Sequence, residues 1–280
     1  MNRQAPYLHS SSAILLDITS DEILFEKNAN TAYPIASMSK LMTISIVLDL
    51  IKDGTIHWDD QVTISETANN IVDSAAKIPI EPKSVLTVRD LFYAMVISSA
   101  NNATIALAEF ISGSEVEFTH LMNETAKGLG LSTANFINAT GLPLSERENE
   151  MSAKDVSLLA SYIINNHSDL LEVTSLEHYY IDAYEIDVFN TNKMLDQSHE
   201  KIYLKEVDGL KTGYTRNAGF CFVSTAEIDG KRLVSVIINS QTDDERFIET
   251  KSLLEFGFGK FRPTLKQFIQ SNDRKLILNE

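Results

Sequence analysis

Residues 34–54 read Pro-Ile-Ala-Ser-Met-Ser-Lys-Leu-Met-Thr-Ile-Ser-Ile-Val-Leu-Asp-Leu-Ile-Lys-Asp-Gly. From Leu41 onward the stretch is apolar on nearly every side, which predicts a mostly buried helix that ends at Gly54. Ser37 and Lys40 stand three positions apart, so a hydroxyl and an amine are neighbours if both lie on this helix. The segment therefore predicts a central helix with a candidate nucleophile at its start.

Strand patterns flank the central helix on both sides in the sequence. Two short apolar or alternating runs, Ser12–Ile18 and Glu22–Glu26, are joined by a polar turn and indicate a hairpin. Near the other end, the runs 219–226 and 232–238 flank Asp229-Gly230, a strong hairpin signal. We expect the first hairpin and the last strands to share one sheet.

The middle of the chain has helical patterns. Residues 87–90, Thr-Val-Arg-Asp, resemble a capping box, in which side chains bond the free backbone N–H groups at a helix start. Because the helices form one block between strands, we predict an α+β fold, a mostly antiparallel sheet packed by helices with an inserted all-helical part at about residues 55–200. The predicted helices cover residues 91–96, 103–111, 115–129, 152–164 and 244–256.

Composition limits the class of function. The 280 residues include 24 Lys and Arg against 39 Asp and Glu, a formal net charge of −15, so we expect no binding to nucleic acid. The single cysteine, Cys221, excludes an internal disulfide and a cysteine-based metal site, and its apolar strand context indicates an inert core residue. The six histidines are scattered without metal-ligand spacing, so we expect no metal and no cofactor.

A serine followed three residues later by a lysine occurs three times, and only one copy has a useful context. The copy at 74–77 runs into Pro79, which blocks a continuing helix, and the copy at 198–201 lies in a polar stretch. Only Ser37 opens a buried helix, whose N-terminus favours a negative charge beside it. Burial disfavours the charged form of Lys40, so its amine can act as a base.

Two further motifs occur once each and carry complementary chemistry. Ser99-Ala-Asn101 joins two apolar helices, so its loop can direct a hydroxyl and an amide into a cleft. Lys211-Thr-Gly213 leads toward a core strand, where it can line a cleft with a cation, a hydroxyl and open backbone. We expect glycine at 213 because a side chain there would crowd a substrate lying alongside.

Each motif also has a purely structural interpretation. Ser37 could cap a helix while Lys40 is solvated, and Ser99 could cap the next helix. Residues 211–213 could form a surface turn. Each of these interpretations is the commoner one for a single motif, but all three motifs in this order are improbable as a coincidence. We therefore interpret them as one acyl-transfer site.

In this order the three motifs resemble those of serine β-lactamases and penicillin-binding proteins. The chain as a whole resembles the low-molecular-mass D-alanyl-D-alanine carboxypeptidases among them, from about residue 12 to residue 258. This resemblance implies a five-stranded antiparallel sheet with the active site between the sheet and the helical part. The shared stretches are Pro34–Thr43, Asn138–Leu142 (Asn-Ala-Thr-Gly-Leu), Asp208–Gly213 and Ala218-Gly219.

The resemblance implies a serine-type D-Ala-D-Ala carboxypeptidase that removes the terminal D-alanine from peptidoglycan pentapeptide stems and is acylated by β-lactams. Ser37 would form the acyl-enzyme, and Lys40 would take its proton. Ser99 and Asn101 would relay protons and hold the substrate amide. Lys211 would supply positive charge nearby.

The resemblance also implies how the free end of the peptide is bound. Thr212 and Arg246 would face the terminal carboxylate. The backbone N–H groups of Ser37 and Tyr214 would stabilise the oxyanion, and Gly213 would belong to the substrate-binding strand. Positive groups in the cleft suit an anionic peptide end in spite of the acidic composition.

By the same resemblance, residues 1–262 form the catalytic domain, and residues 263–280 are interpreted as a truncated tail before a missing anchor or β-domain. No apolar run reaches the ~18 residues of a membrane-spanning helix, and no signal segment is evident. We expect a mature or trimmed form of an exported enzyme of the bacterial cell envelope, at the outer face of the cytoplasmic membrane. Membrane association would depend on segments absent from this chain.

Three alternatives remain open. A class A β-lactamase needs a carboxylate in an Ω-shaped loop to activate the deacylating water. Glu146, Glu148 and Glu150 lie at a plausible position, but no Glu-x-x-x-Asn follows, and we interpret them as solvated charges. A non-catalytic penicillin-sensing or cell-wall-binding module would show a broken set of motifs, whereas all three are intact. A general esterase on the same scaffold is the third alternative.

Overall fold

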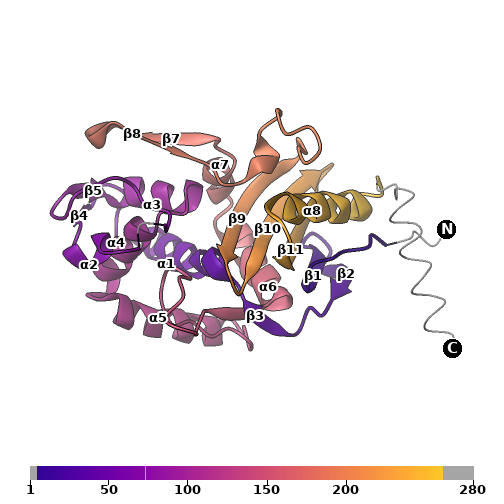
Figure 1. Ribbon diagram of the computed structural model, residues 1–280, viewed down its shortest axis with the longest axis horizontal. Coiled ribbons are helices and arrows are strands. Elements are labelled where there is room, and N and C mark those ends of the chain that lie inside the picture. The colour runs from indigo at the N-terminus through magenta and orange to yellow at the C-terminus, as the bar shows by residue number, and fades with distance from the viewer. Residues whose placement is uncertain (1–4, 73, 261–280) are drawn as a thin grey trace.

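Five strands form the central sheet of the molecule (Figure 1). The structure is a computed structural model that describes residues 5–72 and 74–260. Neighbouring strands are antiparallel in the order β2-β1-β11-β10-β9, so the first hairpin and the last strands share one sheet, as predicted. The strands are β1 (Ser12–Asp17), β2 (Glu22–Lys27), β9 (Val207–Thr215), β10 (Gly219–Ile228) and β11 (Lys231–Ser240).

Helices cover both faces of this sheet, which explains why its central strands lack a polar face. All six residues of β1 are buried. Ile14 belongs to the larger hydrophobic core, together with α6 (Ala153–Asn166), whereas Ala13 and Leu15 belong to a smaller core, together with α8 (Asp243–Gly257). Because successive strand residues point to opposite faces, one apolar run contributes to two cores.

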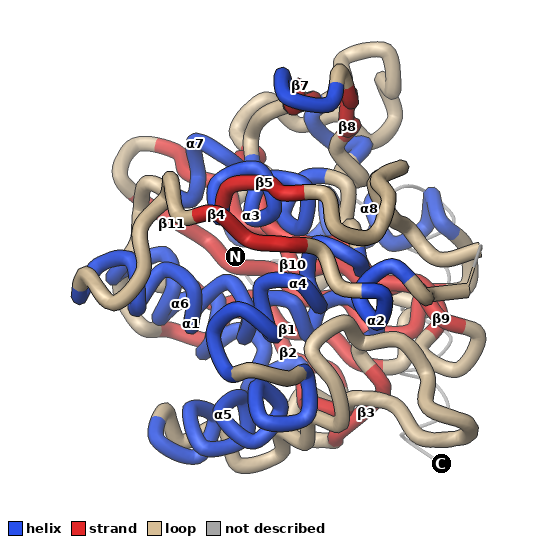
Figure 2. Tube along the Cα trace, turned by 90° about the vertical axis from the view of Figure 1, so that its left-hand side faces the viewer, coloured by secondary structure: helices blue, strands red, loops and turns tan. Residues whose placement is uncertain are grey.

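The helical part lies at one end of the sheet and faces the reader in Figure 2. Two of the expected signals are present at the ends of its helices. The capping box of Thr87 and Asp90 is present, and Gly54 ends α1 in the left-handed conformation with a φ of 78°. The α+β class is therefore confirmed. The remaining helices are α1 (Lys40–Asp53), α2 (Glu66–Asn69), α3 (Val88–Ile97), α4 (Asn101–Ser112), α5 (Glu115–Gly128) and α7 (Leu170–Thr174).

Several short elements were not predicted from the sequence. Strands of three or four residues pair as β3 with β6, β4 with β5 and β7 with β8, and the last pair projects from the body in Figure 1. Strands this short cannot show a clear period in the sequence. These strands are β3 (Ala32–Pro34), β4 (Gln61–Thr63), β5 (Val85–Thr87), β6 (Glu150–Ser152), β7 (His178–Ile181) and β8 (Ile186–Phe189).

The predicted C-terminal tail, residues 263–280, lies outside the described residues. The division into a domain of residues 1–262 and a tail stays a prediction. Within residues 5–72 and 74–260, no helix combines the length and the apolar character that crossing a membrane requires.

Candidate active site

The candidate nucleophile is presented by a tight turn. Ser37 belongs to a single 3₁₀ turn, residues 36–39, that runs directly into α1. Ala36 has a left-handed φ of 48°, and Gly141 packs closely on it, with its own φ at 80°. A Cβ atom at position 141 would lie 2.0 Å from the carbonyl oxygen of Ala36. The loop that contains Gly141 therefore braces the Ser37 turn, and only glycine allows this approach.

Lys40 is fully buried, and its amine makes three contacts. Nζ lies 3.0 Å from Oγ of Ser37, 2.8 Å from Oδ1 of Asn101 and 2.6 Å from the carbonyl oxygen of Thr140. Nδ2 of Asn101 donates to the carbonyl oxygen of Ala76 at 2.9 Å, which fixes the orientation of that amide. Two of the three contacts are with oxygens that can only accept, so the lone pair of a neutral amine faces the Ser37 hydroxyl.

The electrostatic surroundings favour a neutral Lys40. Burial, and then the positive charge of Lys211, hold the pKa of Lys40 well below its usual value, while the carboxylate of Glu115 acts in the opposite direction. Burial, and then the positive charge of Arg246, lower the pKa of Lys211 to about 7. A lysine with a lowered pKa is a competent base near neutral pH.

The third motif lies on β9, one of the two edge strands of the sheet. Its strand conformation excludes the surface turn that was the structural alternative. Lys211 is buried, and Nζ donates to the carbonyl oxygen of Thr212 at 3.3 Å. The Thr212 hydroxyl donates to the hydroxyl of Thr191 at 2.6 Å, a contact for which the sequence carried no signal.

Gly213 is glycine for a reason different from the one we expected. A Cβ atom there would lie 2.8 Å from the carbonyl oxygen of Ile35 and 3.2 Å from the backbone nitrogen of Met38. The crowding would therefore occur against the backbone of the Ser37 turn, rather than against a substrate as predicted. Glycine at this position lets β9 lie directly against the turn that carries Ser37.

Ser99 lies in the connection between α3 and α4, with a left-handed φ of 62°. The residue at the N-cap of α4 is Ala100, so the alternative in which Ser99 caps this helix is wrong. The helix itself begins at Asn101, two residues earlier than predicted. The buried residue Ala100 lies between Ser99, in the loop, and Asn101, the first residue of the helix.

Arg246 lies in the first turns of α8 and is buried. Nη1 donates to the carbonyl oxygens of Gly213, at 3.1 Å, and of Cys221, at 3.3 Å, and Nη2 pairs with Asp243. The guanidinium also lies over the Phe247 ring, 4.7 Å from its centroid. These contacts hold a cation at the edge of β9.

A cleft of ≈ 660 Å³ brings most of the predicted residues together. Lys40 and Lys211 are the two exceptions, because both are buried behind its wall. The predicted residues that line it are Ser37, Ser99, Asn101, Thr212, Gly213, Tyr214 and Arg246. The sequence analysis did not single out the further lining residues Val72, Ala75, Ala76, Pro143, Thr191, Thr215 and Arg216.

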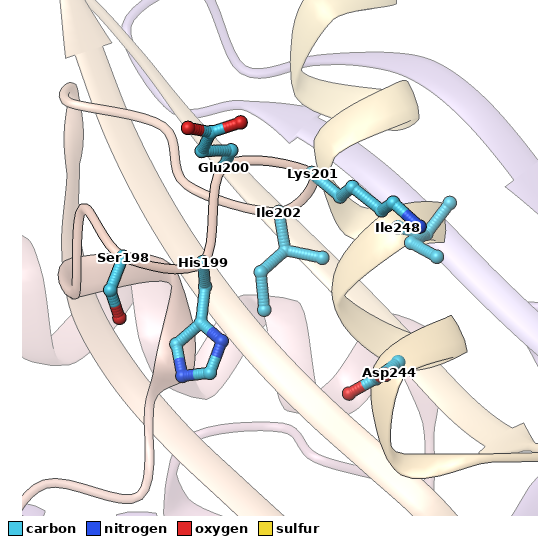
Figure 3. A pocket seen from close by; sticks show the side chains of 7 residues that line it. All are labelled: Ser198, His199, Glu200, Lys201, Ile202, Asp244 and Ile248. Atoms are coloured by element: carbon cyan, nitrogen blue, oxygen red, sulfur yellow. The ribbon is translucent and has the colours of Figure 1, made fainter.

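The rejected copies of the Ser-x-x-Lys pattern do not form a comparable pair. Ser198 and Lys201 line a separate cavity of ≈ 330 Å³, and their side chains point away from one another (Figure 3). The Ser198 hydroxyl instead donates to Asp196 at 2.8 Å. Ser74 lines the large cleft but lies in a segment without helix, as the proline after that copy predicts.

One of the three glutamates that we interpreted as solvated is buried. Glu146 and Glu150 are exposed, but the side chain of Glu148 accepts the Thr215 hydroxyl at 2.6 Å, and the residue is only 7% exposed. The expectation failed because the sequence gives no sign that the loop folds back against the end of β9. Glu148 itself does not line the cleft.

Cys221 is a buried core residue, and burial raises the pKa of its thiol to about 12. A thiol with such a pKa is a poor nucleophile. Among the residues that the structure describes, no group of three or more His, Cys, Asp or Glu side chains is arranged to hold a metal ion.

Known proteins match this chain over most of its length. A family model described as D-alanyl-D-alanine carboxypeptidase, Peptidase_S11, matches residues 1–242. D-alanyl-D-alanine carboxypeptidase DacF of Bacillus subtilis (strain 168) is 33% identical over 254 residues, which are 90% of this chain and 63% of the relative. DacC of Escherichia coli (strain K12) is 32% identical, over 92% of this chain and 63% of the relative. The chain thus spans a little under two thirds of the length of these curated relatives.

Solved structures give the same result. Penicillin-binding protein D2 of Listeria monocytogenes, in its ampicillin-bound form, has a TM-score of 0.80 at 34% identity, over 90% of this chain and 98% of that chain. PBP3 of Streptococcus pneumoniae has a TM-score of 0.84 at 32% identity, over 90% of this chain and 72% of that chain. The match of the family model to most of the chain shows that this protein belongs to the D-alanyl-D-alanine carboxypeptidase family.

Proposed function

We propose that the chain is a serine-type D-Ala-D-Ala carboxypeptidase that removes the terminal D-alanine from peptidoglycan pentapeptide stems, and that β-lactams acylate the same serine. One observation carries the proposal. The amine of buried Lys40 lies 3.0 Å from the hydroxyl of Ser37, and its two other contacts are with oxygens that can only accept. Membership of the family and the similarity to penicillin-binding proteins bound to ampicillin and to cefotaxime support it.

Acylation begins when Lys40 takes the proton of the Ser37 hydroxyl. Ser37 Oγ then forms a bond with the carbonyl carbon of the penultimate D-alanine. The backbone N–H groups of Ser37 and Tyr214 stabilise the resulting oxyanion, which is the role that contributes most to many acyl transfers. The bond from this carbon to the terminal nitrogen breaks, and that nitrogen takes a proton and leaves as the amine of free D-alanine.

Ser99 and Asn101 relay the proton between these steps and hold the substrate amide. The side-chain amide of Asn101 contacts Lys40 through its oxygen and the Ala76 carbonyl through its nitrogen, so its orientation is fixed before the peptide binds. A fixed polar group of this kind costs no reorganisation in the transition state. Ser99 lines the cleft, and its hydroxyl is our candidate to pass the proton from Lys40 to the leaving amine.

The terminal carboxylate of the substrate binds at the third motif. Thr212 and Arg246 line the cleft and offer a hydroxyl and a positive charge, and buried Lys211 adds a second positive charge nearby, although the net charge of the whole chain is −15. Charge-assisted hydrogen bonds to a carboxylate are stronger than neutral ones. Peptides that lack a free terminal carboxylate should therefore bind poorly.

Deacylation completes the cycle. A water molecule adds to the ester carbonyl of the acyl-enzyme, the bond to Ser37 Oγ breaks, and Oγ takes back a proton. The products are the shortened stem peptide and the free enzyme. This chemistry needs peptidoglycan as substrate, so we place the activity outside the cytoplasm, at the outer face of the cytoplasmic membrane.

Two substrates separate this proposal from its rivals. We expect the chain to release free D-alanine from a pentapeptide that ends in D-Ala-D-Ala, and to turn over a chromogenic cephalosporin only slowly after a stoichiometric burst. Rapid, sustained hydrolysis of the cephalosporin would instead identify a β-lactamase. Covalent labelling without release of D-alanine would indicate a sensing module, and cleavage of simple esters alone would indicate an esterase.

A further inference from the structure

A buried carboxylate lies just outside the cleft that the proposed mechanism uses. Glu148 is 7% exposed, and Oε2 accepts the Thr215 hydroxyl at 2.6 Å. Its other oxygen, Oε1, has no hydrogen-bond partner among the described residues. Burying a carboxylate with so few partners costs free energy. A contribution to stability therefore does not explain why a glutamate is buried here. Its short hydrogen bond with Thr215 points to another role.

The Thr215 hydroxyl connects Glu148 to the end of β9. Oγ1 of Thr215 accepts the backbone N–H of Ala218 at 3.0 Å, so the hydroxyl proton is free to point at Glu148. Thr215 lines the cleft and directly follows Tyr214, whose backbone N–H is one of the two proposed oxyanion donors. The position of that N–H is thus tied to the carboxylate through one hydroxyl.

The next residue ties the same loop to the nucleophile. The carbonyl oxygen of Asn149 accepts the backbone N–H of Ile35, at 3.1 Å, immediately before the Ser37 turn. Its side chain accepts the N–H of Ile137 at 2.7 Å and donates to the carbonyl oxygen of Asn138 at 2.9 Å. Two consecutive residues therefore contact both of the elements that carry the proposed oxyanion donors.

We propose that Glu148 is a positioning residue for acylation. Through Thr215 it fixes the end of β9, and so the distance between the Tyr214 N–H and the Ser37 N–H, while Asn149 fixes the Ser37 side of the same gap. Glu148 touches neither the substrate nor the reacting atoms. The inference rests on the proposed function, because it assumes that these two N–H groups stabilise an oxyanion.

Variants at position 148 separate positioning from mere presence of a charge. We expect Glu148→Ala to lower the acylation rate constant for penicillin about tenfold, below the 10²–10³-fold that loss of an oxyanion donor costs. The constant for non-covalent binding should stay the same, since the donors act mainly in the transition state. Glu148→Gln keeps an oxygen that accepts from Thr215, so it should restore acylation to within about twofold. Stopped-flow measurements at several penicillin concentrations separate the two constants.

Asp155 provides a matched control. It is 4% exposed and accepts the hydroxyl of Thr133 at the same distance of 2.6 Å, but neither residue lines the cleft. Asp155→Ala should lower the thermal stability without lowering the acylation rate constant of the folded protein. If Glu148→Ala does not fold, the pair Thr215→Val and Thr215→Ser gives the same test, because only serine keeps the hydroxyl.

The outcomes are distinct. If the wild-type chain is not acylated at all, the proposed function fails and the positioning role fails with it. If the wild type is acylated but Glu148→Ala or Thr215→Val acylates as fast, the positioning role alone is wrong. Equal defects in Glu148→Ala and Glu148→Gln would also overturn it. So would a defect confined to deacylation, which would mean that Glu148 acts on the hydrolytic water.

Discussion

Two buried lysines lie behind the wall of one cleft, and the burial of each lowers the stability of the folded protein. Lys40 and Lys211 are both fully shielded from solvent, and each has a lowered pKa, with burial as the largest cause. Within the part of the chain that the structure describes, Lys40 makes three polar contacts, whereas the Lys211 amine makes one hydrogen bond, to its neighbour Thr212. A buried cation without a carboxylate partner destabilises a fold, so Lys211 is best explained by its action on the substrate.

Replacing Lys211 should therefore separate activity from stability. The folded-state pKa of about 7 lies below the usual value, so the unfolded chain binds more protons between pH 7 and pH 10. This lysine consequently costs stability, most at or below pH 7 and progressively less as the pH rises. We expect Lys211→Met to raise the melting temperature at pH 7 by a few degrees. The same change should slow acylation at least tenfold.

Thermal unfolding and acylation of the two proteins, measured between pH 6 and pH 9, check this prediction. The stability gain should shrink as the pH rises, because removing the proton from Lys211 on folding costs less free energy as the pH approaches the lysine's ordinary pKa. A melting temperature that falls in the variant at pH 7, together with unchanged acylation, would assign Lys211 to the core instead of the site.

At this scale the sequence predicted residue types well and backbone contacts poorly. Ser37 and Lys40 were recognisable because their spacing and the apolar helix behind them limit what they can do. The contact between the Lys40 amine and the carbonyl oxygen of Thr140 could not be predicted, because every residue has a backbone carbonyl oxygen. Glu148 was wrongly interpreted as solvated because the burial of a loop carboxylate depends on how the loop folds back, and not on the residues next to it in the sequence.

Among the elements, the contact between β9 and the Ser37 turn sets the geometry of the cleft. Glycines at 141 and 213 allow the backbone around this turn to approach from two sides. The sequence marked both positions through motifs, but it gave a different reason for Gly213. A substrate was expected to need the space, whereas the backbone of the Ser37 turn occupies it.

Adding one methyl group at position 213 tests this contact. In Gly213→Ala the Cβ would meet the Ile35 carbonyl oxygen at 2.8 Å, and because that atom belongs to the backbone, β9 or the turn must shift. We expect acylation to fall about 100-fold, since displacements near 1 Å in an active site have that effect. Kinetics with a fluorescent penicillin measure the change.

Gly128→Ala is the control for this change. Position 128 is at the end of α5, and a Cβ there meets nothing within 4 Å. Alanine should leave acylation unchanged and stabilise the fold by about 0.4–1 kcal/mol. If Gly213→Ala behaves in the same way, the close approach of β9 to the turn does not set the geometry of the cleft.

Across the whole molecule, one sheet serves two cores. β1, from the start of the chain, pairs with β11, from near its end, and the two faces of this pair pack against α6 and α8. The order of strand and helix patterns predicted a shared sheet. It did not predict the short pairs such as β7 with β8, because strands of four residues show no clear period.

Because the sheet is shared, the two cores should unfold together. Leu159 of α6, in the larger core, is 1% exposed, and Leu254 of α8, in the smaller core on the other face of the sheet, is fully buried. We expect Leu159→Ala and Leu254→Ala each to lower the free energy of unfolding by about 2–5 kcal/mol. Each should shift one common transition in urea, followed by circular dichroism and fluorescence.

Leu158 gives the matched surface control, since it is 37% exposed on the same helix as Leu159. Leu158→Ala should cost clearly less than either buried change. Separate transitions in the two core variants would contradict a single cooperative unit.

The central claim is that Ser37, activated by Lys40, is the residue that becomes acylated. Peptide mass spectrometry of the chain after incubation with benzylpenicillin tests it most directly. We predict one penicillin adduct per molecule, on the peptide that contains Ser37, and none in Ser37→Ala, while circular dichroism shows both proteins to be folded. An adduct on any other residue, or one that persists in folded Ser37→Ala, would contradict the account.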